Sequence, residues 1–238
     1  MQHSSPLKAP LHMARVAGFT YLLIAVFGAF AIAYVPSQII VPGDAQATFA
    51  RLQTRTGLFQ AGIFADVVVI LAEIVLTAIL YALLRPVDAV RSLIAAMARY
   101  AMVLVMAVNL MINVTAFMMA NGQLAGTPET VLALFEVHAM GVYLWGVLFG
   151  MHLLVLGALV CRSGYLPRLL GGLMFVGAFG YLIEGLTRIM ALELPGLPWV
   201  VIGLLSLVTF GELAFALWLL VRGISTAQWD RRQAPLQA

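Results

Sequence analysis

Ionisable side chains that interrupt long apolar segments are the residues of this sequence best suited to chemistry. Asp66 and Glu73 are seven positions apart in one such segment, so a helix would place them within about 20° of one face. In another segment, His138 and His152 are fourteen positions apart and also share a face. An ionisable group surrounded by hydrocarbon costs several kcal/mol unless it is paired or hydrated. These residues therefore predict charge pairs, an ion or proton pathway, or a metal site inside a membrane.

Depth within the membrane sorts the polar residues into two groups. At about 1.5 Å of rise per residue, one group lies roughly 10–13 Å below the outer surface and the other roughly 13–15 Å from the inner surface or near the midplane. The outer group is Asp66, Asn113, His138 and Glu184, the inner group is Glu73, Arg99, His152 and Glu212, and Asn109, Tyr181 and Arg188 extend the same polar faces. We therefore expect a polar interior, built from the second to the sixth span, with two levels.

Three interpretations of this interior stay open. In the first, the charges neutralise one another, Arg99 with Glu212 or Glu73 and Arg188 with Glu184, and fix the register of the helices. In the second, protonatable groups line a pathway for a proton, an ion or a small solute, and Arg99 tunes them. In the third, part of the outer group holds a divalent metal ion.

The metal interpretation assigns Asp66, His138 and Glu184 as ligands. One imidazole and two carboxylates suit zinc or another divalent ion and leave a position open for water. Such a site would belong to a metal-dependent intramembrane hydrolase of an amphiphilic substrate. The sequence has no H-E-x-x-H or other fixed ligand spacing that would support it.

Haem is not expected, although two histidines share one helix. His138 and His152 are spaced so that they could ligate haems at two depths, but each haem needs a second axial ligand. His3 and His12 lie too far from the membrane interior to serve the level of His138.

Two further features predict contacts with other helices or with lipids. Gly146 and Gly150, together with glycines after residue 170, allow close helix approach and offer faces for a homo-oligomer or a non-catalytic membrane scaffold. The turn from Arg162 to Arg168 is basic, and an anionic lipid headgroup or phosphate would suit it.

Composition places these residues in a lipid bilayer. Of the 238 residues, 63% are hydrophobic and 10% are charged, against roughly 45–50% and 25% in soluble domains. Six apolar runs exceed the span of about 20 residues that the hydrocarbon core requires, at about 14–35, 58–84, 89–120, 131–160, 169–191 and 199–221. The sequence therefore predicts an all-α integral membrane bundle of six helices, with polar tails at 1–13 and 223–238. A soluble globule and a disordered chain are excluded, and nucleic-acid binding is not implied.

The basic residues predict the orientation of this bundle. With a cytoplasmic N-terminus, nine Lys and Arg residues fall on the inner side and three on the outer side, as the positive-inside rule requires. Both termini are therefore expected in the cytoplasm. A cleaved signal segment remains an alternative for the first run, because Ala29-Phe30-Ala31 resembles a cleavage site.

A short amphipathic helix is expected outside the membrane between the first two spans. Asp44 can cap it, Phe49 and Leu52 form its apolar side, and Arg51 and Arg55 face water. The helix lies on the outer leaflet in one interpretation, and covers an outward-facing cavity in the other.

Short motifs along the chain resemble one family. They are Arg15-Val16-Ala17-Gly18, Val41-Pro42-Gly43-Asp44-Ala45, Ala65-Asp66, His138, Gly150-Met151-His152, the turn Arg162 to Arg168, Gly180-Tyr181-Leu182-Ile183-Glu184 and Gly211-Glu212-Leu213. In this order they resemble the bacterial membrane family known as domain of unknown function 4386, over about residues 15–223. The resemblance implies a multi-pass bacterial membrane protein and brings no established activity, cofactor or catalytic residue.

We therefore expect a protein of the bacterial inner membrane that handles a proton, an ion or a small solute through its polar interior. The hydrolase and the scaffold are the alternatives.

Overall fold

The computed structural model describes residues 9–234, and the regular structure in this range is helical throughout. Six helices are long and apolar enough to cross a membrane, which confirms the predicted all-α architecture. The first crossing comprises α1 (Ala9–Gly28), the π-helix η1 (Ala29–Tyr34) and α2 (Val35–Ile39), and the others are α4 (Thr56–Leu84), α5 (Ala89–Ala120), α6 (Pro128–Ser163), α7 (Arg168–Ile189) and α8 (Leu197–Val221). Two shorter helices are α3 (Ala45–Thr54) and α9 (Thr226–Gln233). His3 lies outside the described residues.

The helix ends follow local capping chemistry. The Asp88 side chain accepts a hydrogen bond from the backbone N–H of Arg91 at the start of α5, so the helix begins at Ala89 as predicted. Thr127 caps α6 in the same way, and Pro128 occupies the first turn, where its missing N–H is not needed. α6 ends at Ser163 and is followed by Gly164, whose φ of +77° is left-handed. These caps extend α6 by three residues at each end beyond the predicted 131–160.

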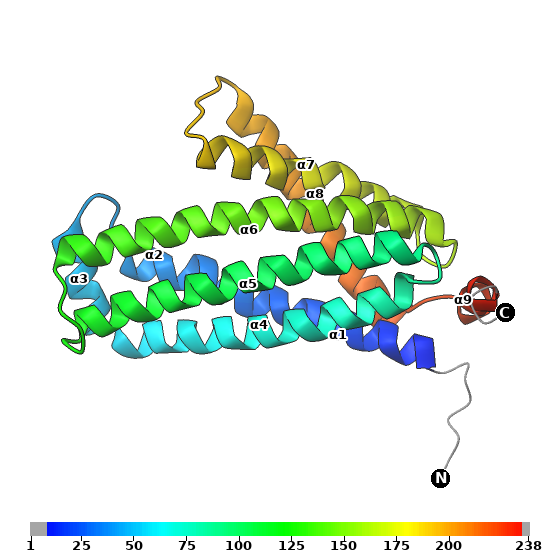
Figure 1. The fold of residues 1–238 in the computed structure, drawn as a ribbon, viewed down its shortest axis with the longest axis horizontal. Helices are drawn as coiled ribbons and strands as arrows, with labels where there is room; N and C mark the ends of the chain where they lie inside the picture. Colours follow the sequence, from blue (N-terminus) through cyan, green and yellow to red (C-terminus); the bar gives the residue numbers. More distant parts are fainter. Residues whose placement is uncertain (1–8, 235–238) are drawn as a thin grey trace, which may run out of the picture.

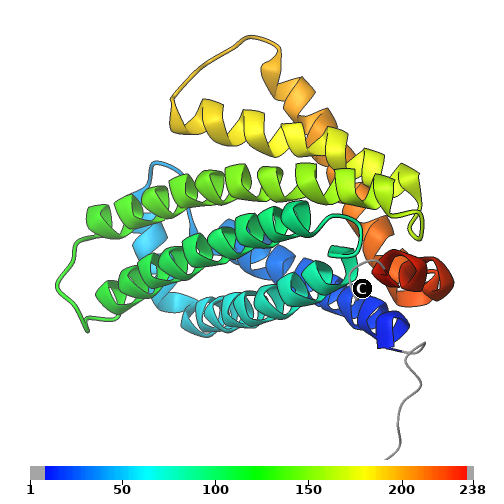
Figure 2. The same ribbon diagram turned by 45° about the vertical axis from the view of Figure 1, so that its right-hand side comes forward.

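The six spans form a closed ring in chain order. Each long helix packs against the next one, and α1 packs against α8 to close the ring. Figures 1 and 2 show α4, α5 and α6 running side by side, with α7 following α6 and the hairpin of α7 and α8 leaning away from α4 and α5 at one end. The start of α1 and the helix α9 lie at the same end of the bundle, which we call the terminal end, and α3 lies at the opposite, distal end (Figure 1).

The first crossing changes from an α-helix to a π-helix in its distal half. Pro36 has no N–H and cannot donate to the carbonyl four residues earlier, at Ile32. The chain passes through the π-helix η1 immediately before this proline. Single π-helical turns within α-helices often occur at functional sites, and η1 lines the cavity described below.

The amphipathic helix expected near Asp44 is present as α3. The Asp44 carboxylate accepts from Ala47 N at 2.8 Å, and Leu52 is fully buried against α5 and α6 side chains. Gln53 Nε2 donates to the Ala120 carbonyl at 2.8 Å. The apolar side of α3 therefore packs on protein across the distal ends of α5 and α6, which favours the covering helix over the one lying on the leaflet.

The polar tail predicted after residue 223 contains the helix α9, which folds back onto the terminal end. Its Trp229 is buried and donates from Nε1 to the Leu83 carbonyl at 3.0 Å. Tyr165 donates from its hydroxyl to the same carbonyl at 2.6 Å. Burial raises the pKa of the Tyr165 hydroxyl, so it keeps its proton and remains a donor. Leu83 is in the last turn of α4, where carbonyls have no intrahelical partner.

This shared carbonyl gives a double-mutant prediction. Tyr165→Phe and Trp229→Phe are each expected to lower the free energy of unfolding by about 1 kcal/mol, because one donor to Leu83 remains in each variant. The double variant should lose more than the sum, since the Leu83 carbonyl then has neither donor. Denaturant titration of all four proteins in detergent measures the coupling, and strict additivity would contradict the shared role.

Candidate functional site

A buried arginine organises the terminal half of the bundle interior. Arg99, from α5, is 1% exposed, and its Nε donates to Glu73 Oε2, from α4, at 2.6 Å. Its Nη1 donates to the Tyr21 hydroxyl at 3.1 Å and lies 3.0 Å from His152 Nε2. Four helices, α1, α4, α5 and α6, thus meet at one guanidinium. We call these four side chains the Arg99 network.

The geometry of the Arg99 network fixes the tautomer of His152. Arginine carries only donors, so His152 Nε2 must accept from Arg99. The other ring nitrogen, Nδ1, lies 2.8 Å from the Ala95 carbonyl, which can only accept. His152 is therefore the neutral tautomer with its proton on Nδ1. Both nitrogens are occupied, which leaves neither for a haem iron.

Aromatic rings enclose the same guanidinium. The Arg99 Cζ atom lies 4.9 Å from the centroid of the Tyr21 ring and 5.5 Å from that of Phe149. The Phe149 ring also stacks on the ring of His152, with centroids 5.9 Å apart. Cation–π contacts of this kind strengthen when the site is dry. The charge of Arg99 is thus held by one carboxylate and two aromatic faces.

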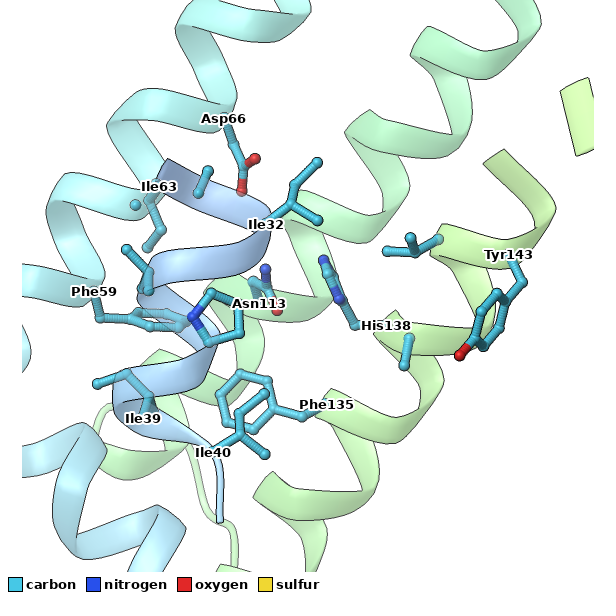
Figure 3. Close-up of a pocket in the computed structure, with 16 residues that line it drawn as sticks. Ile32, Ile39, Ile40, Phe59, Ile63, Asp66, Asn113, Phe135, His138 and Tyr143 are labelled. Carbon is cyan, nitrogen blue, oxygen red and sulfur yellow. The ribbon is translucent and has the colours of Figure 1, made fainter. Parts of the chain in front are cut away.

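A cavity of about 220 Å³ occupies the distal half of the bundle. It is bounded by η1, α2, α4, α5 and α6, and we call it the distal cavity. Figure 3 shows Asp66, Asn113 and His138 extending toward it from α4, α5 and α6, respectively. Aliphatic side chains and the rings of Phe59 and Phe135 form most of its remaining wall (Figure 3). The distal cavity therefore has a polar side, formed by Asp66, Asn113 and His138, and an apolar side.

The distal cavity continues toward the Arg99 network. A smaller space of about 30 Å³ shares Asp66 and His138 with it and adds Asn109 and Trp145. Trp145 Nε1 is buried without a hydrogen-bond partner among the described residues. The Trp145 ring stacks on Phe149 at a centroid distance of 5.1 Å, and Phe149 lies over Arg99. Aromatic contacts thus separate the cavity from the network.

The structure brings most of the predicted groups together. Asp66, Asn113 and His138 of the outer group share the distal cavity, whereas Glu184 lines a separate space of about 560 Å³ between α7 and α8. No cluster of three His, Cys, Asp or Glu residues able to hold a metal occurs in residues 9–234. The predicted metal site of Asp66, His138 and Glu184 is therefore not assembled, because α7 leans away from α4 at the distal end.

One of the predicted ion pairs is confirmed. Arg99 pairs with Glu73, one of its two predicted partners. Arg188 and Glu184 line the same space but form no ion pair in the described part of the chain. Arg188 instead lies over the ring of Tyr143, with Cζ 5.8 Å from its centroid.

Two other members of the predicted polar interior lie near the network without joining its hydrogen bonds. Glu212, from α8, is half-buried and makes no ion pair within residues 9–234, but it is close enough to Arg99 and Glu73 to interact with their charges. The Tyr181 ring packs edge-on against Trp145 and Phe149.

The contribution of the first crossing was missed. The interior was expected from the second to the sixth span, but Tyr21 joins the Arg99 network and η1 lines the distal cavity. Tyr21 and Thr20 are adjacent polar residues in an otherwise apolar run, which was the available signal. The sequence prediction overlooked Thr20 and Tyr21 because their hydroxyl groups are less polar than the carboxylates and imidazoles on which it relied.

The basic turn between α6 and α7 has a structural partner. The Arg162 carbonyl accepts from Arg232 Nη2 of α9 at 2.9 Å, and the Arg168 carbonyl accepts from Cys161 Sγ at 3.4 Å. Both contacts use the main chain, so the guanidinium groups of Arg162 and Arg168 stay available for the predicted lipid headgroup.

Comparison with known proteins places this arrangement in a family. The family described as "Domain of unknown function (DUF4386)" matches residues 16–223. The chain belongs to this family. The DUF4386 match includes the whole Arg99 network and every residue around the distal cavity, and it confirms the resemblance seen in the sequence.

An archaeal relative covers part of this DUF4386 chain. A protein of Archaeoglobus fulgidus, named "Uncharacterized protein", is 36% identical over 96 residues, which are 38% of this chain and 54% of the relative. The chain thus spans about half the length of that relative. No solved structure matches the chain. The bacterial inner membrane stays a prediction.

Proposed function

We propose that this protein moves protons, alone or together with a small solute, across the membrane that it spans. The observation that carries the proposal is the series of polar sites along the bundle, with an open cavity at one level and a closed hydrogen-bonded network at the next. Intramembrane carboxylates and histidines mark proton and ion pathways in membrane proteins. Asp66 and His138 are such groups, and they face a space large enough to hold water.

The Arg99 network would act as the barrier of this pathway. On its terminal side, a small space of about 10 Å³ is lined by His152, Thr77 and Ser92. The network thus separates two spaces, of which the distal one is much larger. A fixed arginine charge at a constriction opposes the passage of cations. Exchange between a conformation open at the distal end and one open at the terminal end would require the contacts of Arg99 to rearrange.

Proton flux tests this proposal directly. Purified protein is reconstituted in vesicles that contain a pH-sensitive dye, and a pH gradient is imposed. Asp66→Asn is expected to lower the protein-dependent flux at least tenfold, because the carboxylate that accepts the proton is gone. Glu136→Gln is the matched control, since Glu136 is an exposed carboxylate of α6, and its flux should equal that of the unmodified protein. Equal flux in Asp66→Asn and the control, or flux no greater than in empty vesicles, would contradict the proposal.

We also propose that the terminal end faces the cytoplasm, as the basic residues indicate. In a Cys161→Ser background, a cysteine at Ala227 in α9 would report on the terminal end and one at Gln123 on the distal end, since both positions are exposed. A membrane-impermeant maleimide added to intact cells is expected to label Gln123→Cys and not Ala227→Cys. The opposite labelling would reverse the orientation.

A further inference from the structure

We propose that the distal cavity binds a small organic ammonium ion, an amine with N–H donors and a short apolar chain. The inference rests on the proposed function, because it names the class of solute that the same cavity would take. Four properties of the cavity lead to it, namely its unpartnered polar atoms, its charge, its apolar wall and its size.

Unpartnered acceptors are the first property. Asn113 Oδ1 is buried and has no hydrogen-bond partner in the described part of the chain. Asp66 forms no ion pair within residues 9–234, and an ionised carboxylate can only accept hydrogen bonds. The main-chain carbonyl of His138 accepts from Asn109 Nδ2 at 3.3 Å, and the His138 ring is turned to the cavity (Figure 3). A ligand that donates hydrogen bonds would satisfy Asn113 Oδ1, whose desolvation is otherwise uncompensated, and would also find an acceptor in the half-buried carboxylate of Asp66.

Charge is the second property. The residues around the cavity include one carboxylate, Asp66, and neither a lysine nor an arginine. Arg99 is committed to Glu73, and Arg188 is exposed and lies over the Tyr143 ring rather than in the cavity. A cation is therefore favoured in the cavity, and an anion would meet the Asp66 charge without a counter-ion.

The apolar wall is the third property. Phe59 and Phe135 are buried and meet edge-to-face, with centroids 5.9 Å apart. Figure 3 shows these rings and Ile40 on one side of the cavity and Asp66 on the other. Aromatic faces attract cations, and the same wall removes an alkyl chain from water. A bare metal ion or a proton would leave this wall without a function, whereas an alkylammonium ion uses both sides.

Size is the fourth property. The volume of about 220 Å³ is below the roughly 300–1,000 Å³ of sites for drug-sized molecules. It corresponds to the bulk volume of about seven water molecules, at about 30 Å³ each. An amine with a few carbon atoms fits this space. A quaternary ammonium ion of the same size has no N–H and would leave Asn113 Oδ1 unpartnered.

Thermal unfolding in detergent tests the inference. A ligand that binds only the folded protein stabilises it by RT ln(1 + L/Kd), where L is the free ligand concentration, so its Tm continues to rise as L exceeds Kd. The probe is n-butylammonium chloride titrated at constant ionic strength. For the unmodified protein we expect a rise in Tm that follows this logarithmic dependence with a single Kd, and no rise with n-butanol, which has the same chain and no charge. Tetramethylammonium chloride should bind at least tenfold more weakly than n-butylammonium.

Variants assign the binding to the cavity. Asp66→Asn is expected to weaken n-butylammonium binding at least tenfold, and Glu136→Gln, which removes an exposed carboxylate, should bind as the unmodified protein does. Asn113→Asp adds a second carboxylate to the same cavity and is expected to tighten binding. This gain keeps the test decisive where Asp66→Asn gives too little folded protein.

Each remaining outcome has a definite meaning. An equal response to n-butanol, or unchanged affinity in Asp66→Asn, would overturn the inference, and equal binding of tetramethylammonium would overturn the need for N–H donors. Proton flux that depends on Asp66, without saturable amine binding, would overturn the ammonium ligand and leave the proposed function standing. Amine binding without protein-dependent flux would overturn the proposed function instead.

Discussion

Replacing Arg99 with methionine is expected to lower the free energy of unfolding by about 3–5 kcal/mol, because removal of one partner leaves a buried charge uncompensated. Glu73 is 3% exposed and has Arg99 as its ion-pair partner in the described structure. The variant also removes the donor to His152 Nε2 and to the Tyr21 hydroxyl. Methionine keeps much of the length and the apolar stem of arginine, so the loss reports on the guanidinium itself.

The same helix supplies a matched control for Arg99→Met. Arg91 pairs with Asp88 at 3.0 Å, but the two side chains are 45% and 31% exposed. Exposed ion pairs contribute about 0–1 kcal/mol, so Arg91→Met should fall in that range. Equilibrium unfolding in mixed micelles, with sodium dodecyl sulfate as denaturant, measures both. A loss below about 1 kcal/mol in Arg99→Met would show that the network does not hold the helices together.

The sequence predicts the membrane architecture well because the bilayer imposes a simple length requirement. An apolar run of about 20 residues must cross as a helix, since an unpaired backbone group costs several kcal/mol in hydrocarbon. The run 89–120 accordingly has the same bounds as α5. The same reasoning could not predict the helix α9, because Thr226–Gln233 is polar and does not cross the membrane. Its position depends on Trp229 reaching a carbonyl of α4, far away in sequence.

The candidate site was predicted in part, and the reason for the limit is geometric. Periodicity and rise per residue give the face and depth of a side chain on its own helix. They correctly group Asp66, Asn113 and His138, whose helices α4, α5 and α6 run side by side (Figure 1). Glu184 has a similar depth along α7, but the tilt of a helix is not encoded in its own hydrophobic pattern. The lean of α7 and α8 is set instead by where these helices can approach their neighbours.

Glycines determine how closely α6 and α7 can approach each other. The second prediction with a large expected effect concerns one of these glycines. At one of the close contacts between α6 and α7, Gly157 faces Gly171. A Cβ atom on Gly171 would lie 2.7 Å from the Gly157 carbonyl oxygen and 2.9 Å from Cys161 N, both backbone atoms that cannot move aside. The faces proposed for a homo-oligomer are thus used within the chain at this contact. Gly171→Ala is expected to lower the free energy of unfolding by about 1–3 kcal/mol, as overpacking does.

The adjacent residue isolates packing from helix propensity. A Cβ atom on Gly172 would meet no atom within 4 Å, so Gly172→Ala should leave stability unchanged or raise it by up to about 1 kcal/mol, the gain of alanine over glycine in a helix. Both variants make the same chemical change one position apart in α7. The unfolding titration used for Arg99 compares them, and equal effects would mean that the crossing of α6 and α7 does not depend on the glycine contact. A large loss confined to Gly171→Ala would show that this contact holds α7 against α6 near the terminal end. The distal half of α7 packs on α6 through a second glycine, Gly185, and the neighbouring Glu184 lines the space between α7 and α8 rather than the cavity that Asp66 and His138 share.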